Sequence, residues 1–333
     1  MANIDSITTE NDIGTPTDIS IVVPAYDEAE NLASLHEKIK DSLADTDFRW
    51  ELIFCDDGSK DDTWQEINKI RDADTRVSGL RLSRNFGHQY ALLAGLTAST
   101  GRAVITMDAD HQHPPDLLPM LINSWKHGNK IVHTIRKDPK SIGIFKRLTS
   151  RIYYRVYSIL SGVTITPGMA DFRLLDRQVV DNILSYREEG VFLRGIVQLV
   201  GYSSDSISFT AQERRSGDTK YSLGKMLRFA WTGISSFSTV PLRIGIFVGL
   251  FTSVSAFGWM FWAVWARFYG QYFVPGWASA LSITTFLFGI LFILLGIIGD
   301  YVGRILIEVK NRPRYLISES IGLDSDETHA SEK

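Results

Sequence analysis

Cysteine is almost missing from this sequence, and several other common features are missing altogether. Cys55 is the only cysteine among 333 residues, which excludes an intrachain disulfide and suits a reducing compartment. The formal net charge of −3 gives no global positive field, so nucleic acid is not an expected partner. Neither a P-loop nor a Gly-x-Gly-x-x-Gly fingerprint occurs, which disfavours kinase and dehydrogenase classes.

The first 18 residues lack the basic and then apolar pattern of a signal peptide. They are polar and acidic, so we expect residues 1–18 to be disordered and the large N-terminal part to stay in the cytoplasm. Charge is also scarce in residues 241–300, within an overall charged fraction of 22%. There the uncharged runs 244–266 and 277–299 are each long enough, at roughly 34 Å as helices, to cross a hydrocarbon core of about 30 Å.

These two runs predict a transmembrane helical hairpin over residues 241–303. Basic residues flank the hairpin, whereas the loop between the runs carries only Arg267. The positive-inside rule therefore places the large N-terminal domain and both termini in the cytoplasm, on a multi-pass protein of the plasma (inner) membrane. A buried helical hairpin in a soluble core is the alternative interpretation.

Two further segments adjoin the hairpin. Residues 220–240 have apolar side chains at helical spacing among lysines and an arginine, which indicates an amphipathic helix at the membrane interface or a plain surface helix. Residues 304–333 form a cytoplasmic tail, and its polar, acidic part from Ser318 to Lys333 is expected to be disordered.

Residues 19–219 predict an alternating α/β domain. Short apolar runs at 19–23, 51–55, 77–82, 103–107 and 130–134 are typical of buried strands, and segments of helical periodicity at 28–43, 62–71, 88–96 and 117–125 separate them. Such alternation indicates a Rossmann-like, mainly parallel sheet covered by helices. Ligands bind beyond the carboxyl ends of the strands in such sheets.

Acidic clusters follow three of the predicted strands. They read Pro-Ala-Tyr-Asp-Glu from Pro24, Cys-Asp-Asp-Gly-Ser from Cys55, and Asp-Ala-Asp-His-Gln-His from Asp108. Each alone fits a helix cap. Together they surround one cleft with carboxylates, which is costly unless a cation or hydrogen-bond donors occupy it.

Asp108 and Asp110 are the natural ligands of that cation. Alternate residues leaving a strand can turn their oxygens toward one ion, and hard oxygen ligands suit Mg²⁺ or Mn²⁺. Zinc is the weaker alternative, because the His111-Gln112-His113 spacing is poor for tetrahedral closure.

The ordered motifs PAYDEAEN, CDDGSKDDT, RNFGHQ and MDADHQHPP resemble glycosyltransferase family 2, whose catalytic domains have the GT-A fold. The resemblance covers roughly residues 18–225. Within the family, DADHQHPP and RRSGDTKY are similar to segments of the polyprenyl-phosphate glycosyltransferases, and the C-terminal hairpin is similar to that of the bacterial bactoprenol glucosyltransferases. His111 stands where the family usually has leucine.

The resemblance implies roles for individual residues. The nucleotide sugar would contact Pro24, Ala25, Tyr26, Glu28, Asp56 or Asp57, Gly87 and Gln112. The metal and diphosphate would be held by Asp108, Asp110 and Gln112. Catalysis would further involve Asp171, Arg214 and Lys220. The acceptor phosphate would face Arg136, Arg147, Ser150 and Arg151, of which the last three lie on a predicted amphipathic helix at 146–160.

The implied activity is metal-dependent transfer of a hexose from a nucleotide sugar to a polyprenyl phosphate with inversion at C1. UDP-glucose is the favoured donor by resemblance, with GDP-mannose and UDP-linked amino sugars as alternatives. A processive polysaccharide synthase is a rival, although Ser216 stands where that class has tryptophan in Gln-x-x-Arg-Trp. A non-enzymatic membrane scaffold is another rival, disfavoured by the presence of Asp108, Asp110 and Lys220. Gly245, Gly249 and Gly296 on the spans indicate a homo-oligomer, such as a tetramer.

Overall fold

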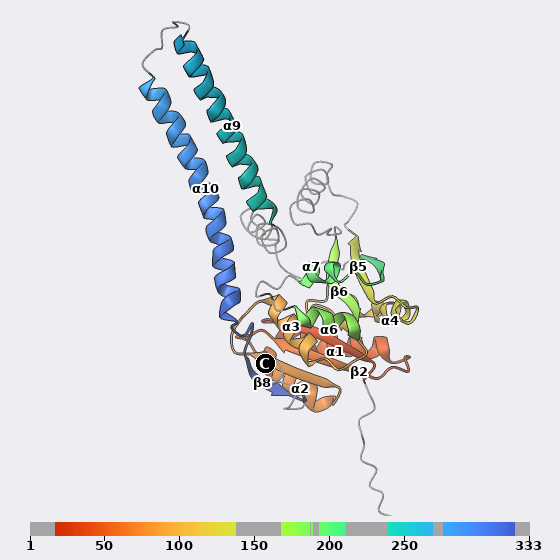
Figure 1. Cartoon of the computed structure of the whole chain (residues 1–333). Coiled ribbons are helices and arrows are strands. Elements are labelled where there is room, and N and C mark those ends of the chain that lie inside the picture. The colour runs from red at the N-terminus through yellow and green to blue at the C-terminus, as the bar shows by residue number, and fades with distance from the viewer. Residues whose placement is uncertain are drawn as a thin grey trace, which may run out of the picture.

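An eight-stranded mixed sheet forms the centre of the protein (Figure 1). This computed structural model describes residues 17–137, 168–186, 188, 193–210, 239–268 and 276–323. The strands are β1 (Ile19–Ala25), β2 (Trp50–Asp56), β3 (Val77–Leu82), β4 (Ala103–Thr106), β5 (Ile131–Lys137), β6 (Met169–Asp176), β7 (Ser204–Thr210) and β8 (Ile317–Ile321). The helices are α1 (Ala29–Leu43), α2 (Thr63–Ala73), α3 (His88–Ala98), the short 3₁₀ turn η1 (Pro115–Leu117), α4 (Leu118–Lys126), α6 (Arg177–Ser185), α7 (Leu193–Leu199), α9 (Val240–Phe268) and α10 (Trp277–Lys310).

The strand order is β7-β5-β6-β4-β1-β2-β3-β8. Strands β4, β1, β2 and β3 are parallel neighbours, as are β5 and β7, whereas β6 and β8 run antiparallel to their neighbours. In the register of β1 with β2, Ala25 lies opposite Asp56, so both strands end at the same edge. That edge collects the loops that follow β1, β2 and β4.

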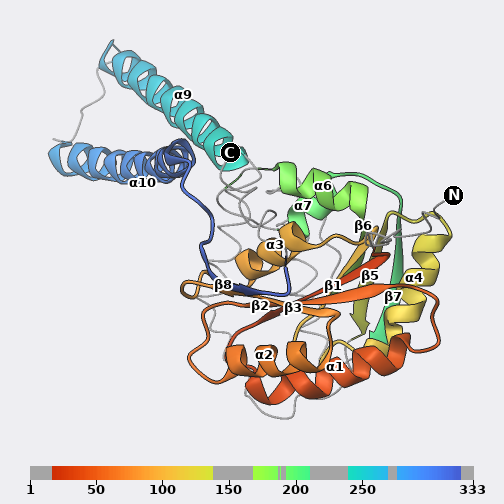
Figure 2. The same cartoon turned by 90° about the horizontal axis from the view of Figure 1, so that it is seen from below.

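Helices cover both faces of the sheet, as Figure 2 shows. Helices α1, α2 and α4 pack on one face, where α1 buries Leu32, Leu35 and Ile39 at helical spacing. Helices α3, α6 and α7 pack on the other face. Helix α3 approaches closely, since a Cβ at Gly95 would lie 2.3 Å from Val22 Cγ1. This approach brings the start of α3 to the edge where the acidic loops meet.

The predicted alternation of strand and helix through residue 134 is confirmed, with ends within three residues of the prediction. The prediction of disorder from Ser318 onward is wrong for the part that the structure describes. Residues Ile317–Ile321 form β8, which adds an antiparallel strand to the edge of β3. Its two isoleucines are half-buried against the two cores, and its Glu319 accepts hydrogen bonds from β3 and α2 side chains.

Helices α9 and α10 lie side by side and run away from the sheet (Figure 1). Leu242–Trp262 and Ser282–Lys310 are long and apolar enough to cross a membrane, and neither stretch is buried inside the protein. Their apolar side chains point outward, for example Phe251 at 74% exposure. The alternative of a hairpin buried in a soluble core is therefore wrong for these helices, and such a surface indicates association with a membrane.

The two helices contact each other at the end nearest the sheet. A Cβ at Gly245 of α9 would lie 3.0 Å from Leu294 Cδ2 of α10, so Gly245 serves packing within one chain. Apart from the neighbouring turns of the same helix, no atom of the described residues lies within 4 Å of a Cβ built at Gly249 or Gly296. Helix α10 continues to Lys310, beyond the predicted second span.

Candidate active site

The loops after β1 and β2 are tied together by backbone hydrogen bonds. The Asp57 N–H donates to the Ala25 carbonyl over 2.9 Å, and the Asp27 N–H donates to Ser59 Oγ over 2.9 Å. The Lys60 N–H in turn donates to Asp27 Oδ1 over 2.8 Å. These contacts hold both loops in a fixed relation without a ligand.

Asp56 ends β2 as a fully buried carboxylate. Its Oδ1 accepts from the Ser59 N–H over 2.8 Å, and its Oδ2 lies 3.3 Å from Arg81 Nε. Burial raises the pKa of Asp56, while Ser59 and Arg81 oppose the rise. Arg81 also donates to Glu319 Oε1 of β8 over 2.8 Å. The C-terminal strand therefore supports Asp56 through Arg81.

Asp57 ties β2 to the loop before α3. Its Oδ1 accepts from the Phe86 N–H over 2.7 Å, and its Oδ2 accepts from the Gly87 N–H over 2.8 Å. The same two loops touch at Gly58, which has φ +69° and where a Cβ would lie 2.5 Å from the Arg84 carbonyl carbon. Only glycine fits there. Both oxygens of Asp57 are used, whereas Asp56 Oδ2 accepts no hydrogen bond from the described residues.

The loop after β4 turns two carboxylates toward the cleft. Met107 and Ala109 are buried, and the alternating Asp108 and Asp110 are partly exposed, as the sequence pattern predicts. Burial raises the pKa of Asp108; the nearby histidines His113 and His88 oppose the rise, and repulsion from neighbouring carboxylates adds to it.

His113 fixes the conformation of this loop. The Asp108 N–H donates to His113 Nδ1 over 2.9 Å, and the imidazole ring stacks on Phe172 of β6 with 5.2 Å between ring centroids. Burial lowers the pKa of His113, so the ring is neutral with its proton on Nε2. Between these anchors, His111 adopts φ 59°, a left-handed conformation that histidine tolerates better than leucine does.

Gln112 links Asp110 to β5. Its backbone and side-chain N–H groups both donate to the Asp110 carboxylate. Its Oε1 accepts a hydrogen bond from Arg136 over 2.9 Å. One of the four residues predicted at the acceptor phosphate therefore lies beside a predicted metal ligand.

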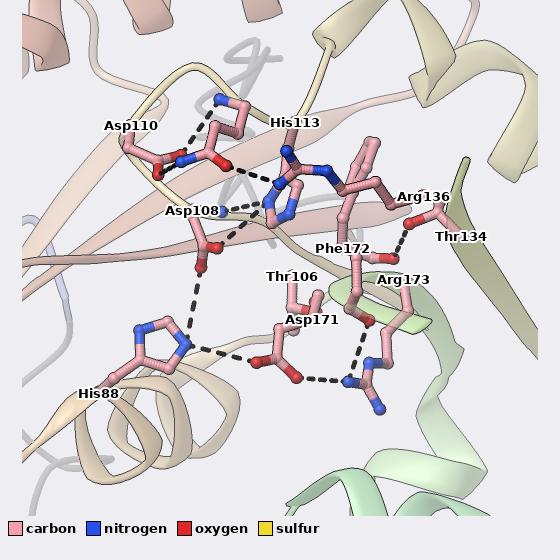
Figure 3. A network of polar contacts seen from close by, with 12 residues as sticks. His88, Thr106, Asp108, Asp110, His113, Thr134, Arg136, Asp171, Phe172 and Arg173 are labelled. Atoms are coloured by element: carbon pink, nitrogen blue, oxygen red, sulfur yellow. Dashed lines mark hydrogen bonds and ion pairs between the residues drawn. The ribbon is translucent and has the colours of Figure 1, made fainter. Parts of the chain in front are cut away.

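Asp171 of β6 lies on the side of Asp108 away from Asp110 (Figure 3). Basic side chains contact it there. Arg194 donates to both oxygens, over 2.9 and 2.6 Å, and Arg173 donates to Oδ1. Burial alone would raise the pKa of Asp171, but Arg194 and Arg173 hold it well below its usual range. His88 Nε2 lies 3.8 Å from Asp171 Oδ2 and 3.6 Å from Asp108 Oδ1, bridging the two carboxylates.

The carboxylates that follow β1 and β4 also affect each other. The pKa of Glu28 is raised by burial first and then by Asp110, Asp108 and the nearby Asp61. This mutual repulsion is what a divalent cation would relieve. Within the described residues no three histidine, cysteine or acidic side chains converge as a metal site. Two carboxylates fit Mg²⁺ or Mn²⁺ in the usual way, in which substrate phosphates and water complete the coordination.

The structure thus brings together the predicted site residues that it describes. They are Pro24, Ala25, Tyr26, Glu28, Asp56, Asp57, Gly87, Asp108, Asp110, Gln112, Arg136 and Asp171. Those that lie outside the described residues are Arg147, Ser150, Arg151, Arg214 and Lys220, together with the predicted helix at 146–160 and most of 220–240.

Three side chains that contact Asp171 were not predicted from the sequence, namely His88, Arg173 and Arg194. Arg173 could have been found, because Asp171 and Arg173 alternate on one strand and share a face. His88 follows Gly87 within the RNFGHQ motif, and its position at a strand-to-helix junction was the only signal. Arg194 had none, since it reaches Asp171 from 23 residues away.

Comparisons with known proteins agree with this geometry. Residues 20–184 match the family described as glycosyl transferase family 2. The bactoprenol glucosyl transferase derived from prophage SfII of Shigella flexneri is 37% identical over 302 residues, covering 91% of this chain and 98% of that protein. A prophage bactoprenol glucosyl transferase homologue of Escherichia coli is 38% identical, covering 90% and 98%. An uncharacterised glycosyltransferase of Bacillus subtilis is 36% identical, covering 92% and 95%.

Among solved structures, glucosyl-3-phosphoglycerate synthase from Mycobacterium tuberculosis, in complex with Mn²⁺, UDP-glucose and phosphoglyceric acid, is 20% identical with a TM-score of 0.46, covering 66% of this chain and 79% of that one. The sequence similarities, on a sheet with acidic loops at its carboxyl edge, define a glycosyltransferase with a GT-A fold. The chain belongs to glycosyl transferase family 2.

Proposed function

We propose that the protein transfers glucose from UDP-glucose to undecaprenyl phosphate or a similar polyprenyl phosphate, with inversion at C1. The observation that carries the proposal is the convergence of Asp108, Asp110 and Asp171 beside the β1 and β2 loops. Relatives named bactoprenol glucosyl transferase, aligned over nearly their full length, support the donor and the acceptor.

The nucleotide would occupy the edge formed by the β1 and β2 loops. Pro24, Ala25, Tyr26 and Glu28 line that edge, and the half-exposed Tyr26 offers a ring for contact with the nucleotide. Asp56 keeps one oxygen without a hydrogen bond from the described residues, whereas Asp57 uses both on backbone N–H groups. We therefore assign the shaping of the loop that carries Gly87 to Asp57, and to Asp56, which is buried against Arg81, the positioning of the loop at the end of β2 that faces the nucleotide.

Asp108, Asp110 and Gln112 would hold Mg²⁺ or Mn²⁺ together with the diphosphate. The ion supplies a Lewis acid that offsets the charge of the departing nucleotide. Gln112 Nε2 keeps Asp110 oriented, and Gln112 Oε1 holds Arg136 beside the same loop. Arg136 is thus positioned to attract a second phosphate by a charge-assisted hydrogen bond.

The acceptor needs no strong general base. A polyprenyl phosphate is a monoester whose second pKa lies near 6, so it is largely a dianion at neutral pH. Asp171 is a poor candidate for a base, because its cationic neighbours hold its pKa well below the usual range and donate hydrogen bonds to both of its oxygens. Its role is to orient His88 toward the sugar site. Arg136, with Arg147, Ser150 and Arg151, would align the acceptor phosphate, and Arg214 and Lys220 would close over the diphosphate.

We further propose that α9 and α10 cross the plasma membrane as a hairpin, with the catalytic domain and both chain ends on the cytoplasmic side. Basic residues at the sheet end of α10 support this orientation. The open surfaces around Gly249 and Gly296 support contacts between chains in a homo-oligomer such as a tetramer.

The experiment is a transfer assay on the detergent-solubilised full chain. Undecaprenyl phosphate and Mn²⁺ or Mg²⁺ are mixed with radiolabelled UDP-glucose, GDP-mannose or UDP-N-acetylglucosamine, and the organic phase is counted. We expect label from UDP-glucose only, its loss with EDTA, and a β-linked product by NMR. Label from GDP-mannose would reassign the donor, a retained anomer would exclude direct displacement, and a long water-soluble polymer would indicate a processive synthase.

A further inference from the structure

A second polar site lies away from the acidic cleft, where α10 meets the sheet domain. A cavity of about 400 Å³ opens there between the last turn of α10, the segment after it, and the loop that precedes α3. Its principal lining residues are Arg84, Phe86, Tyr90, Lys310, Arg312 and Arg314.

Four cations meet in this cavity from two segments more than 200 residues apart. None of the four forms an ion pair with a carboxylate among the described residues. Arg314 donates to the Tyr186 carbonyl over 2.6 Å, and Arg84 lies 4.1 Å over the Phe86 ring. The acids close by are Glu188 and Glu308, and the pKa of Glu188 is raised by burial and by Glu308 while Arg314 opposes the rise. The positive charge around the cavity is thus in excess of the acidic charge.

The C-terminal end of α10 explains only part of this arrangement. A lysine in the last turn, such as Lys310, stabilises the negative end of a helix. That argument does not account for Arg84, which comes from the loop after β3. Cations from separate elements around one hollow repel each other, and a bound anion relieves that repulsion.

The position of the cavity identifies the source of the anion. The apolar stretch of α10 ends at Lys310, and exposed apolar side chains continue along it to the last turn, including Val302, Leu306 and Val309. A lipid whose acyl chains lie along these side chains would carry its phosphate to Lys310 and Arg312. Arginine and lysine near the surface of an anionic leaflet favour such contacts.

We propose that this cavity binds the phosphate headgroup of an anionic membrane phospholipid. The proposal rests on the membrane insertion of α10 proposed above, but not on the transfer reaction. The bound phosphate connects α10 to the loop that carries Gly87 and His88, so it would hold the acidic cleft at a fixed height above the membrane.

The experiment measures phospholipid binding to the full chain in a neutral detergent. Phosphatidylglycerol or phosphatidylcholine is titrated into wild type, into Arg84→Gln/Arg312→Gln and into Lys310→Gln/Arg312→Gln, and bound lipid is counted by native mass spectrometry. The matched control is Lys40→Gln/Lys69→Gln, which removes two exposed lysines from the far face of the sheet. We expect both cavity variants to bind phosphatidylglycerol roughly 10- to 30-fold more weakly, since each cation contributes to attraction for an anionic headgroup. The control should match wild type.

Equal phosphatidylglycerol binding by all four proteins would overturn the proposal. Equal binding of phosphatidylcholine and phosphatidylglycerol by wild type would overturn it as well, because the site would then not select anionic headgroups. If inorganic phosphate displaced phosphatidylglycerol when both were present at equal concentration, a lipid would be excluded as the source of the anion. Thermal unfolding without lipid distinguishes a lost site from a lost fold, and the second cavity variant is expected to keep the wild-type midpoint because both of its altered side chains are exposed. A chain that binds phosphatidylglycerol but transfers no sugar would refute the proposed reaction and leave this site standing.

Discussion

The carboxylates that follow β2 and those that follow β4 lie at the same edge of one sheet, in opposite surroundings. Asp56 and Asp57 are buried, and backbone N–H groups donate to three of their four oxygens. Asp108 accepts no hydrogen bond from the described residues through its side chain, which faces two histidines at 3.6 Å. Within the described part of the chain, Asp110 accepts hydrogen bonds from Gln112 only.

The difference separates two uses of the same side chain. Donors around Asp56 and Asp57 are supplied by the fold, so these carboxylates stabilise the loops in the free protein. Asp108 and Asp110 raise the pKa of their acidic neighbour Glu28 by repulsion, so we expect a divalent cation to stabilise them. Substitutions in the two pairs should therefore separate stability from activity, and the following predictions proceed from the largest expected effect to the smallest.

Asp108→Asn should abolish most activity without harming the fold. Removing a metal carboxylate forfeits several kcal/mol of transition-state stabilisation, so we expect transfer to fall on the order of 10²- to 10³-fold. The midpoint of thermal unfolding should stay level or rise, because a source of repulsion disappears. The control is Asp116→Asn in η1. Activity within tenfold of wild type would remove Asp108 from the metal site.

Asp57→Ala should show the opposite pattern. Two backbone N–H groups lose their acceptor, and each unpaired buried donor destabilises by about 1–3 kcal/mol. Thermal unfolding in detergent should shift down by several degrees, while residual activity per folded molecule stays well above that of Asp108→Asn. Asp62→Ala, an exposed acid that does not cap its helix, is the comparison. If Asp57→Ala unfolded at the same temperature as Asp62→Ala, the two carboxylates after β2 would not differ from those after β4 in their contribution to stability.

His133 offers a buried titratable group on β5 that belongs to neither pair. Burial, with a contribution from Arg173, lowers its pKa to about 4. The unfolded chain therefore takes up a proton near pH 6.5 that the folded chain does not, so stability falls as the pH drops from 7.5 to 5.5, by about 1 kcal/mol. His133→Phe should flatten this dependence, since the buried His133 Nδ1 has no hydrogen-bond partner to lose. The test is the midpoint of thermal unfolding at pH 7.5 and at pH 5.5, with His127→Phe as control. If His133→Phe lost as much stability between the two pH values as wild type, His133 would not be the group that takes up the proton.

Glu319→Gln should have the smallest effect on activity. It weakens the ion pair that holds Arg81 beside Asp56. The half-exposed pair with Arg81 contributes up to about 1 kcal/mol, so weakening it should raise the KM for the nucleotide sugar roughly threefold with kcat unchanged. Glu37→Gln on α1 is the matched control. A fall in kcat at constant KM would contradict a role in nucleotide positioning.

Much of this fold could be predicted from the sequence, because its first half repeats one pattern. Apolar runs such as 19–23 and 103–107 are short, uninterrupted and followed by polar residues, which is typical of parallel strands buried on both faces. The meeting of Asp56, Asp57, Asp108 and Asp110 then follows from topology alone. Strand β8 could not be predicted, because its sequence ISESI lies in a polar tail and depends on an open edge of β3 for its pairing.

The charge environment of the site was harder to predict than its location. Arg194 meets Asp171 only because α7 packs beside β6, a tertiary relation that leaves no local pattern, whereas Arg173 shares a face of β6 with Asp171. Without these arginines, Asp171 would be an ordinary carboxylate. With them its pKa is lowered and both of its oxygens accept hydrogen bonds, which makes it a weak base and an anchor beside His88.

The return of the chain to β3 also sets an order of events during synthesis. Arg81 and its partner Glu319 are 238 positions apart, with both apolar helices made between them. At roughly 5–20 residues per second, the ribosome takes on the order of 10–50 seconds to deliver that partner. During this interval the edge of β3 stays open, a hazard for pairing with other chains. The sheet that holds the acidic loops after β1, β2 and β4 is therefore completed only in a chain that has already made both apolar helices.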